Sequence, residues 1–117
     1  MQTETKASVD QTSDNKGGRV SVLRFSGDIS SSSHDALLGT YETVSKTEPV
    51  LLDFTKVDYI NSSGIALVIQ MLIEAANSGQ KVFAFGLSPH FTQVFTMVGI
   101  TKYAGLFAGQ AEALAAL

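Results

Sequence analysis

The chain has 117 residues, of which 44% are hydrophobic and 16% are charged. This length and composition indicate one domain with a packed core, and they exclude a chain that is disordered throughout. The net charge of −3 argues against a nucleic-acid-binding protein, and the absence of cysteine excludes disulfides and thiol chemistry.

No segment of the sequence predicts membrane insertion. The most apolar run, residues 65–73, is about nine residues long and contains Gln70, whereas a spanning helix needs roughly 20 apolar residues. Residues 1–19 contain no apolar stretch of the kind that a secretory signal requires. We therefore expect a cytoplasmic protein.

Residues 1–18 are almost entirely polar or small. Such a segment buries too little apolar surface to offset the entropy that it loses on ordering. We therefore predict a flexible polar tail at 1–18 and one folded domain at 19–117. Deletion of the tail is expected to leave the melting temperature within about a degree or two of the wild-type value.

The folded part begins with a predicted strand, "RVSVLRF" (19–25). Val20 and Val22 fall on one face of this strand, and Leu23 and Phe25 fall on the other. The enrichment in β-branched and aromatic residues is typical of a strand.

A helix is predicted at residues 31–46. "SGD" (26–28) is expected to end the preceding strand, and Ser32 with Asp35 three residues later resembles a capping box at the start of the helix.

The remaining elements are predicted from their periodicity and their turn residues. They are a buried strand at 50–54, a turn at 55–58, a strand-like piece at 59–60, a helix at 63–77, a strand at 81–87, a helix at 88–99, an edge strand at 103–107 and a helix at 109–117. The 88–99 helix has Ser88 as its N-cap, Pro89 at its first position and Gly99 at its end, with Phe91, Val94, Phe95 and Val98 on its apolar face.

Strands and helices therefore alternate along the chain. This order predicts an α/β fold with a central mixed, mainly parallel sheet of four to five strands and about four helices packed mostly on one side.

The sequence offers little support for an enzyme or a metal site. His34 and His90 fall in the first turns of two different helices and are expected at the surface, so no base is predicted beside a serine nucleophile. No phosphate-binding glycine loop is present, and two distant histidines without thiols do not suggest zinc. We expect no enzymatic activity, no cofactor and no metal.

Three carboxylates lie near predicted strand ends, where parallel sheets present their binding sites: Asp28, Asp53 and Asp58. Turn formation and interaction with helix dipoles explain these positions equally well.

The stretch "NSSG" (61–64) stands at the start of an apolar helix. One interpretation is a loop in which a serine caps the helix and Gly64 allows close backbone approach. The alternative is a site of phosphorylation, because the N–H groups and the dipole of a helix N-terminus stabilise an added phosphate. Ser63 is nearer the first turn and is predicted to be the cap, which leaves Ser62 as the available hydroxyl.

The longer stretch "LLDFTKVDYINSSGIALVIQ" (51–70) resembles the central signature of STAS domains, the fold shared by anti-sigma factor antagonists and the cytoplasmic tails of sulphate transporters. "FSGDIS" (25–30) is similar to the turn after the first long strand of the family. "GLSPHFTQVFTMVGI" (86–100) is similar to its Ser-Pro, central Phe and terminal Gly-Leu/Ile. The resemblance extends from about residue 19 to the C-terminus and implies a single STAS-like domain.

The resemblance implies an anti-sigma factor antagonist, a bacterial signalling protein that regulates transcription by partner switching. Ser62 falls on the serine that is phosphorylated by the anti-sigma factor, which is also a serine kinase of the GHKL type. A serine phosphatase is a further partner that the resemblance allows. The expected partner-binding residues are Asp28, Ser30, Asp58, Asn61, Ser63 and Gly64.

Two positions depart from the family signature. Asn61 stands where the family usually has aspartate and lacks its charge, and Ala66 stands where a second glycine is usual. Asn61 keeps an alternative open, in which the chain is a non-phosphorylated STAS scaffold subunit of a signalling assembly or of a lipid-transport system.

Overall fold

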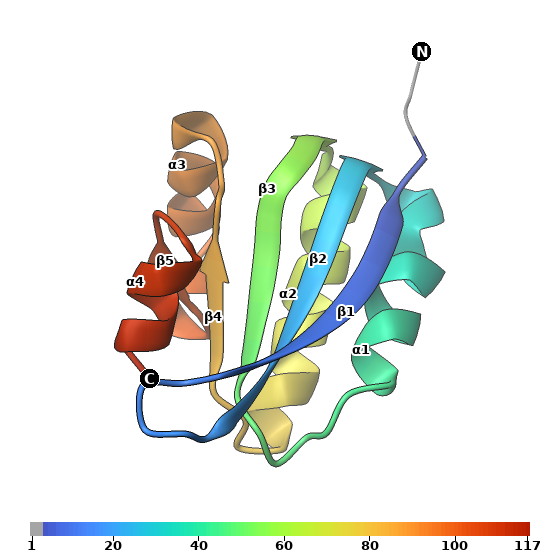
Figure 1. The fold of residues 1–117 in the computed structure, drawn as a ribbon. Coiled ribbons are helices and arrows are strands. Elements are labelled where there is room, and N and C mark those ends of the chain that lie inside the picture. The colour runs from blue at the N-terminus through green and yellow to red at the C-terminus, as the bar shows by residue number, and fades with distance from the viewer. Residues whose placement is uncertain (1–3) are drawn as a thin grey trace.

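The structure is a computed structural model that describes residues 4–117 (Figure 1). At its centre is a five-stranded sheet whose strands lie side by side in chain order. The first pair is antiparallel and the remaining pairs are parallel. The strands are β1 (Lys6–Ser13), β2 (Arg19–Ile29), β3 (Val50–Ile60), β4 (Val82–Phe85) and β5 (Gly105–Phe107).

The connections between the strands carry the helices. In residues 4–117 these are a 3-10 turn (Ser31–Ser33), a π turn (Asp35–Gly39), α1 (Thr40–Glu42), α2 (Ser62–Asn77), α3 (Pro89–Met97), a second 3-10 turn (Ile100–Lys102) and α4 (Gln110–Ala115). The predicted fold class, a single α/β domain with a mixed, mainly parallel sheet, is confirmed. None of these helices is long and apolar enough to cross a membrane.

The helices cover the two faces of the sheet unequally. Figure 1 views the sheet with α1 and α2 behind it, and α3 contributes to the same core. In that core the ring of Phe54 lies 5.6 Å from the rings of both Phe25 and Phe95, measured between centroids. Burial of each such side chain stabilises the fold by roughly 1.5–3 kcal/mol.

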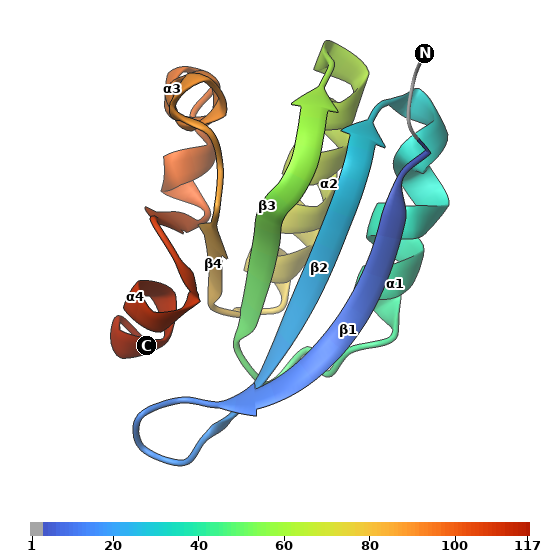
Figure 2. The same cartoon turned by 45° about the horizontal axis from the view of Figure 1, so that its top comes forward.

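A smaller cluster lies on the opposite face under α4. Val20 and Val22 of β2 pack there, whereas Leu23 and Phe25 pack on the face of α2. The alternation predicted for residues 19–25 is therefore confirmed. The larger part of the sheet on this second face, over β1 and β2, carries no helix (Figures 1 and 2).

The prediction of a flexible tail at 1–18 is wrong for most of that segment. Residues 6–13 form β1, which pairs with β2 over its whole length, from Lys6 opposite Ser26 to Ser13 opposite Arg19. Backbone hydrogen bonds to β2, rather than burial of side chains, hold this strand, so composition gave no sign of it. Residues 1–3 of the predicted tail lie outside the described residues.

The turn between β1 and β2 is fixed by Asp14. Its Oδ1 accepts hydrogen bonds from the N–H groups of Lys16 and Gly18, each at 2.8 Å. These two bonds hold the pKa of the Asp14 carboxyl below its ordinary value. Gly17 adopts a φ of +84°, which is readily open only to glycine.

The breaks predicted at 26–28 and 55–58 are also wrong, because β2 and β3 continue through both. The hydrogen-bonded ladder between β2 and β3 continues past the turn-forming residues with two shifts in register, one after Arg24 and one after Gly27. Gly27 makes the second possible with a φ of +84°. At the first, the Asp53 carboxylate accepts a hydrogen bond from the Thr55 N–H at 2.8 Å.

The helix predicted at 31–46 is a chain of three short helical pieces, and its predicted cap is wrong. The Ser30 N–H donates to Ser33 Oγ at 2.9 Å, so the capping pair begins two residues earlier than the predicted pair of Ser32 and Asp35. The start of α3, by contrast, is confirmed: Ser88 is the N-cap, its side chain accepts from the Phe91 N–H at 3.2 Å, and Pro89 follows it.

Candidate functional site

The start of α2 lies at the end of the sheet formed by the C-terminal ends of the parallel strands β2 and β3. Ile29 and Ile60 are paired at these ends, and Asn61 follows directly. The Asn61 N–H donates to the carbonyl of Ile29 at 3.1 Å, which ties the entry of α2 to the neighbouring strand. Binding sites of α/β proteins commonly lie at the C-terminal ends of the parallel strands.

Asn61 is the N-cap of α2, and the prediction that Ser63 is the cap is wrong. The Asn61 side chain accepts a hydrogen bond from the Gly64 N–H at 2.8 Å, between Oδ1 and N. Its backbone carbonyl accepts from the Ile65 N–H at 2.9 Å. An extended backbone at Asn61 places the short amide over the first turn, so the helix begins one residue before the predicted start.

Gly64 lets α2 approach the end of β2 closely. A Cβ atom at this position would lie 2.4 Å from the carbonyl oxygen of Ile29, which is closer than any side-chain carbon tolerates. The glycine therefore fixes the height of the helix start above the sheet, and it is buried rather than presented to a partner.

Both serines of "NSSG" are exposed on the first turn of α2. Because Asn61 caps the helix, neither hydroxyl is committed to that role. The two differ in their surroundings, since Ser62 lines a groove beside the helix and Ser63 is not among the residues that line it.

The groove has a volume of about 270 Å³ and lies between the end of β3, the start of α2 and α3. Its lining is mostly apolar: Tyr59, Ile60, Asn61, Ser62, Ile65, His90, Phe91, Val94 and Val98. The Tyr59 ring packs edge-on against Phe91 at 5.9 Å between centroids, yet 55% of Tyr59 remains exposed. Val98 is 48% exposed, so the groove offers apolar surface to a partner.

The model of the family described as "Mlab, STAS domain" matches residues 12–108 of this sequence. The chain belongs to the STAS domain family. The matched range begins at Thr12, near the end of β1, and extends past β5. Among curated proteins, no relative matches the chain.

Solved structures share the fold of this STAS domain at low sequence identity. An anti-sigma factor antagonist from Mycobacterium paratuberculosis is 16% identical with a TM-score of 0.75, and the match covers 97% of this chain and 93% of that one. The Bacillus cell fate determinant SpoIIAA in its phosphorylated form is 17% identical with a TM-score of 0.66, covering 92% and 96%. A sulfate transporter family protein from Wolinella succinogenes is 19% identical with a TM-score of 0.72, covering 83% of each chain.

The other predicted partner-binding residues of the STAS domain lie near the same C-terminal ends of β2 and β3. Asp28 is paired with Tyr59 at the end of the β2–β3 ladder, and Asp58 is an exposed residue at the irregularity before it. Ser30 is only 6% exposed and contacts Ser32 Oγ at 3.0 Å, so it is less accessible than expected. Asp53 lies away from this end of the strands: it is buried on the face of the sheet that carries α4, where Arg24 binds it at 2.8 Å.

The histidines are both exposed, as expected. His34 contacts Asp35 at 3.1 Å, and His90 packs against the Phe91 ring at 4.8 Å between centroids. Within residues 4–117, no group of three or more histidine, aspartate or glutamate side chains is placed to hold a metal ion.

Sequence reasoning missed two residues of the groove, Tyr59 and His90. Tyr59 was expected to end a strand, and His90 was expected to be an ordinary surface residue. The apolar face predicted for the 88–99 helix contained the available signal, because Phe91, Val94 and Val98 on that face line the groove.

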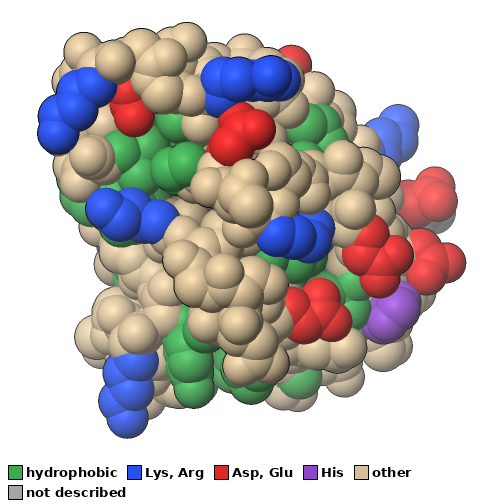
Figure 3. All heavy atoms as spheres, turned by 90° about the horizontal axis from the view of Figure 1, so that it is seen from below, with side chains coloured by type: hydrophobic (Ala, Val, Ile, Leu, Met, Phe, Trp, Pro, Cys, Tyr) green, Lys and Arg blue, Asp and Glu red, His purple; other side chains and the backbone are tan. Residues whose placement is uncertain are grey.

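Charge is mixed at the end of the molecule opposite this site. Figure 3 shows basic and acidic side chains interspersed over that face rather than a basic stripe. A surface of this kind gives nucleic acid no continuous track of positive charge.

Proposed function

We propose that this STAS domain is an anti-sigma factor antagonist in a bacterial partner-switching pathway. In its unphosphorylated form it binds an anti-sigma factor that is also a GHKL-type serine kinase, and phosphorylation of Ser62 releases it. The observation that carries the proposal is the exposed Ser62 hydroxyl, which lines an apolar groove at a helix start whose cap is supplied by Asn61.

The groove gives such a partner a surface to bind. Tyr59 and Val98 provide exposed apolar area, and burial of apolar area drives most protein association. An apolar side chain of the kinase would fill the groove and bring Ser62 close to the nucleotide held by that kinase.

Phosphorylation would act on the partner rather than on the fold. Transfer of the γ-phosphoryl group of ATP to Ser62 Oγ adds roughly −1.5 to −2 units of charge. The first-turn N–H groups of α2 stabilise that charge, so the domain stays folded. At the rim of an apolar groove, however, a phosphate would have to lose water whenever the partner docks, and this cost opposes binding.

In this proposed role the protein acts by binding its partner in the cytoplasm. It needs no cofactor and catalyses no reaction itself. The structural similarity to an anti-sigma factor antagonist and to SpoIIAA supports this role at the level of the fold. A serine phosphatase that restores the Ser62 hydroxyl would complete the cycle.

A second candidate is a STAS scaffold subunit of a signalling assembly or a lipid-transport system that is never phosphorylated. Asn61 favours it, because a kinase that recognises the family's aspartate at this position would lose a charged contact. The sulfate transporter family protein from Wolinella succinogenes has the same fold, so fold similarity does not separate the two candidates.

Phosphate mapping separates them. The partner is captured from native lysate with the wild-type domain, and the captured kinase is incubated with the domain and ATP before mass spectrometry. We expect one phosphate on Ser62, none in Ser62→Ala and unchanged incorporation in Ser63→Ala. Phosphate on Ser63 alone would reverse the assignment. An active kinase that leaves both serines unmodified would favour the scaffold.

A further inference from the structure

The outer edge of β1 is long and regular. The strand has eight residues, and the β1–β2 ladder runs through all of them without an irregularity. Within residues 4–117, no other strand pairs with this edge, since β1 is the first strand of the sheet. The opposite edge strand, β5, has only three residues. Long edge strands without proline or a bulge are templates for pairing with another chain.

The side chains of β1 are complementary to a second, antiparallel copy of the same strand. If the two copies pair about Ser8, Lys6 of each lies opposite Asp10 of the other, and Ala7 lies opposite Val9. Directly opposed residues of unlike charge stabilise an antiparallel pair. Val9 is 36% exposed in the single chain, and its pairing with Ala7 would cover part of that apolar surface.

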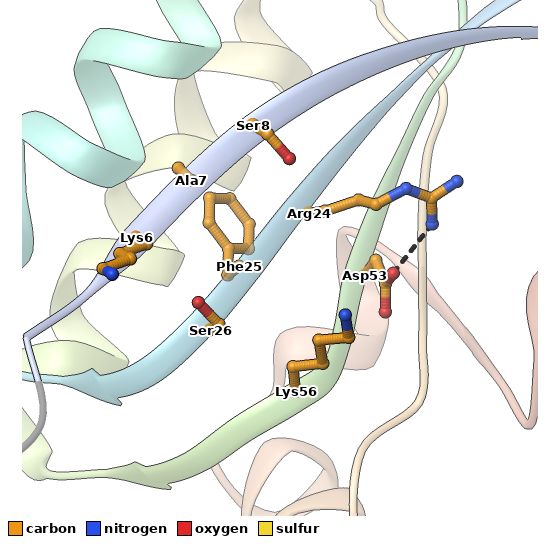
Figure 4. A pocket seen from close by; sticks show the side chains of 8 residues that line it. All are labelled: Lys6, Ala7, Ser8, Arg24, Phe25, Ser26, Asp53 and Lys56. Carbon is orange, nitrogen blue, oxygen red and sulfur yellow. Dashed lines mark hydrogen bonds and ion pairs between the residues drawn. The ribbon is translucent and has the colours of Figure 1, made fainter.

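The position of these residues on the sheet permits such pairing. Lys6 and Ser8 extend from β1 on the face that carries Arg24 (Figure 4). Arg24 donates to Asp10 at 2.5 Å and to Asp53 at 2.8 Å, so Asp10 is held in place on that face. In the paired form, Asp10 would lie between Arg24 of its own chain and Lys6 of the second copy.

We propose that the protein forms a two-fold symmetric homodimer in which the β1 strands of two copies pair in antiparallel fashion about Ser8. The pairing joins the two sheets into one continuous sheet. Because β2 separates β1 from β3, the groove beside Ser62 stays open in the dimer. We expect an interface made by one pair of eight-residue strands to bury less than roughly 1,200 Å², the lower limit for standard-size protein complexes, and therefore to associate reversibly in the micromolar range.

A charge exchange at two positions tests the register. Lys6→Asp places two carboxylates opposite each other at both contacts of a homodimer, and Asp10→Lys places two ammonium groups there. An equimolar mixture of the two variants restores opposite charges at both contacts. By sedimentation equilibrium at about 10 to 500 μM, we expect each variant alone to associate at least about tenfold more weakly than wild type. The mixture should associate at least as well as wild type.

A cysteine at the symmetry axis provides a second test, and the chain contains no other cysteine. Ser8→Cys should form an intermolecular disulfide under mild oxidation, because opposed residues of an antiparallel pair lie within disulfide distance. Ser13→Cys is the matched control at the end of the same strand. In the proposed register the two copies of residue 13 are ten residues apart along the strand, roughly 33 Å, and should not cross-link.

Three results would overturn the proposal. The first is a wild-type protein that sediments as a monomer over the whole concentration range. The second is association that is equally strong in wild type and in each charge variant alone, which would place the interface elsewhere. The third is cross-linking of Ser13→Cys at the rate of Ser8→Cys.

Discussion

Replacement of Gly64 by alanine tests how the start of α2, at the candidate functional site, is held against the sheet. The added Cβ would lie 2.4 Å from the carbonyl oxygen of Ile29 and 2.8 Å from its carbonyl carbon. Both neighbours are backbone atoms of β2, so no side chain can rotate away and the start of α2 must move. Overpacking of this kind costs about 1–3 kcal/mol, and the higher helix propensity of alanine recovers less than about 1 kcal/mol of it. We expect a net loss of stability of about 1–2 kcal/mol.

Gly39→Ala is the matched control for this change. Gly39 also lies in a helical segment, with a φ of −63°, and a Cβ there would have no heavy atom within 4 Å. Alanine should therefore stabilise the fold at this position by about 0.5–1 kcal/mol. Urea unfolding of the two variants and wild type, followed by circular dichroism, measures both changes. If Gly64→Ala is as stable as wild type while Gly39→Ala behaves as expected, then α2 does not depend on close contact with Ile29.

Three further predictions concern the cap of α2, the strand β1 and the turn between β1 and β2. Asn61→Ala should lower the free energy of unfolding by about 1 kcal/mol, because it orphans the Gly64 N–H, whereas Ser63→Ala should change it by less than about 0.5 kcal/mol. Thermal unfolding measures both changes. If Ser63→Ala is the more destabilising of the two, then Ser63 rather than Asn61 is the cap. Deletion of residues 1–18 should lower the melting temperature by roughly ten degrees and promote aggregation, because it removes β1 and exposes the edge of β2. A loss of only a degree or two, measured by scanning calorimetry, would contradict a structural role for β1.

The last of the three is a pH effect. The folded-state pKa of Asp14 is lowered by its bonds to the Lys16 and Gly18 N–H groups, so the stabilisation of the turn is present above the ordinary pKa of 3.8 and is lost as pH falls through the lowered value. The two amide proton resonances should shift together in that window in an acid titration followed by NMR. Shifts centred at or above pH 3.8 would contradict these bonds.

Local signals in the sequence predicted several elements well. Ser88, Pro89 and Gly99 fixed both ends of the 88–99 helix, because a cap, a proline at the first position and a glycine with positive φ each have a local physical cause. The alternation of residues 19–25 likewise predicted which side chains face each core cluster. These features depend on neighbouring residues alone, so the sequence contains them directly.

Features that depend on a partner strand were not predictable in this way. β1 is polar and is held by its backbone bonds to β2. The turn-forming residues near Gly27 and Thr55 lie inside long strands, because the parallel ladder tolerates an extra residue at two places. At one of them Gly27 adopts a positive φ, and at the other the Asp53 carboxylate accepts a hydrogen bond from the Thr55 N–H. Composition and turn propensity describe one segment at a time and miss such compensation.

For the candidate site, the sequence predicted the place of the "NSSG" motif at a helix start and only part of its local detail. "NSSG" lies at the helix start as expected, yet Asn61 and Ser63 can both cap a helix, and only the backbone conformation at Asn61 decides between them. The groove arises because α3 packs beside the end of β3, which brings His90 and Phe91 next to Tyr59. That juxtaposition joins segments about thirty residues apart and has no local signature.

The affinity of the captured anti-sigma factor kinase for the domain, with and without phosphate on Ser62, tests the central claim most directly. Isothermal titration of wild type, the Ser62-phosphorylated protein, Ser62→Asp and the control Ser63→Asp would give four dissociation constants. We predict that phosphate on Ser62 weakens binding by about 100-fold, or about 2.7 kcal/mol, that Ser62→Asp weakens it in the same direction, and that Ser63→Asp has a smaller effect. Equal affinities of the phosphorylated and unphosphorylated domains would contradict the switch.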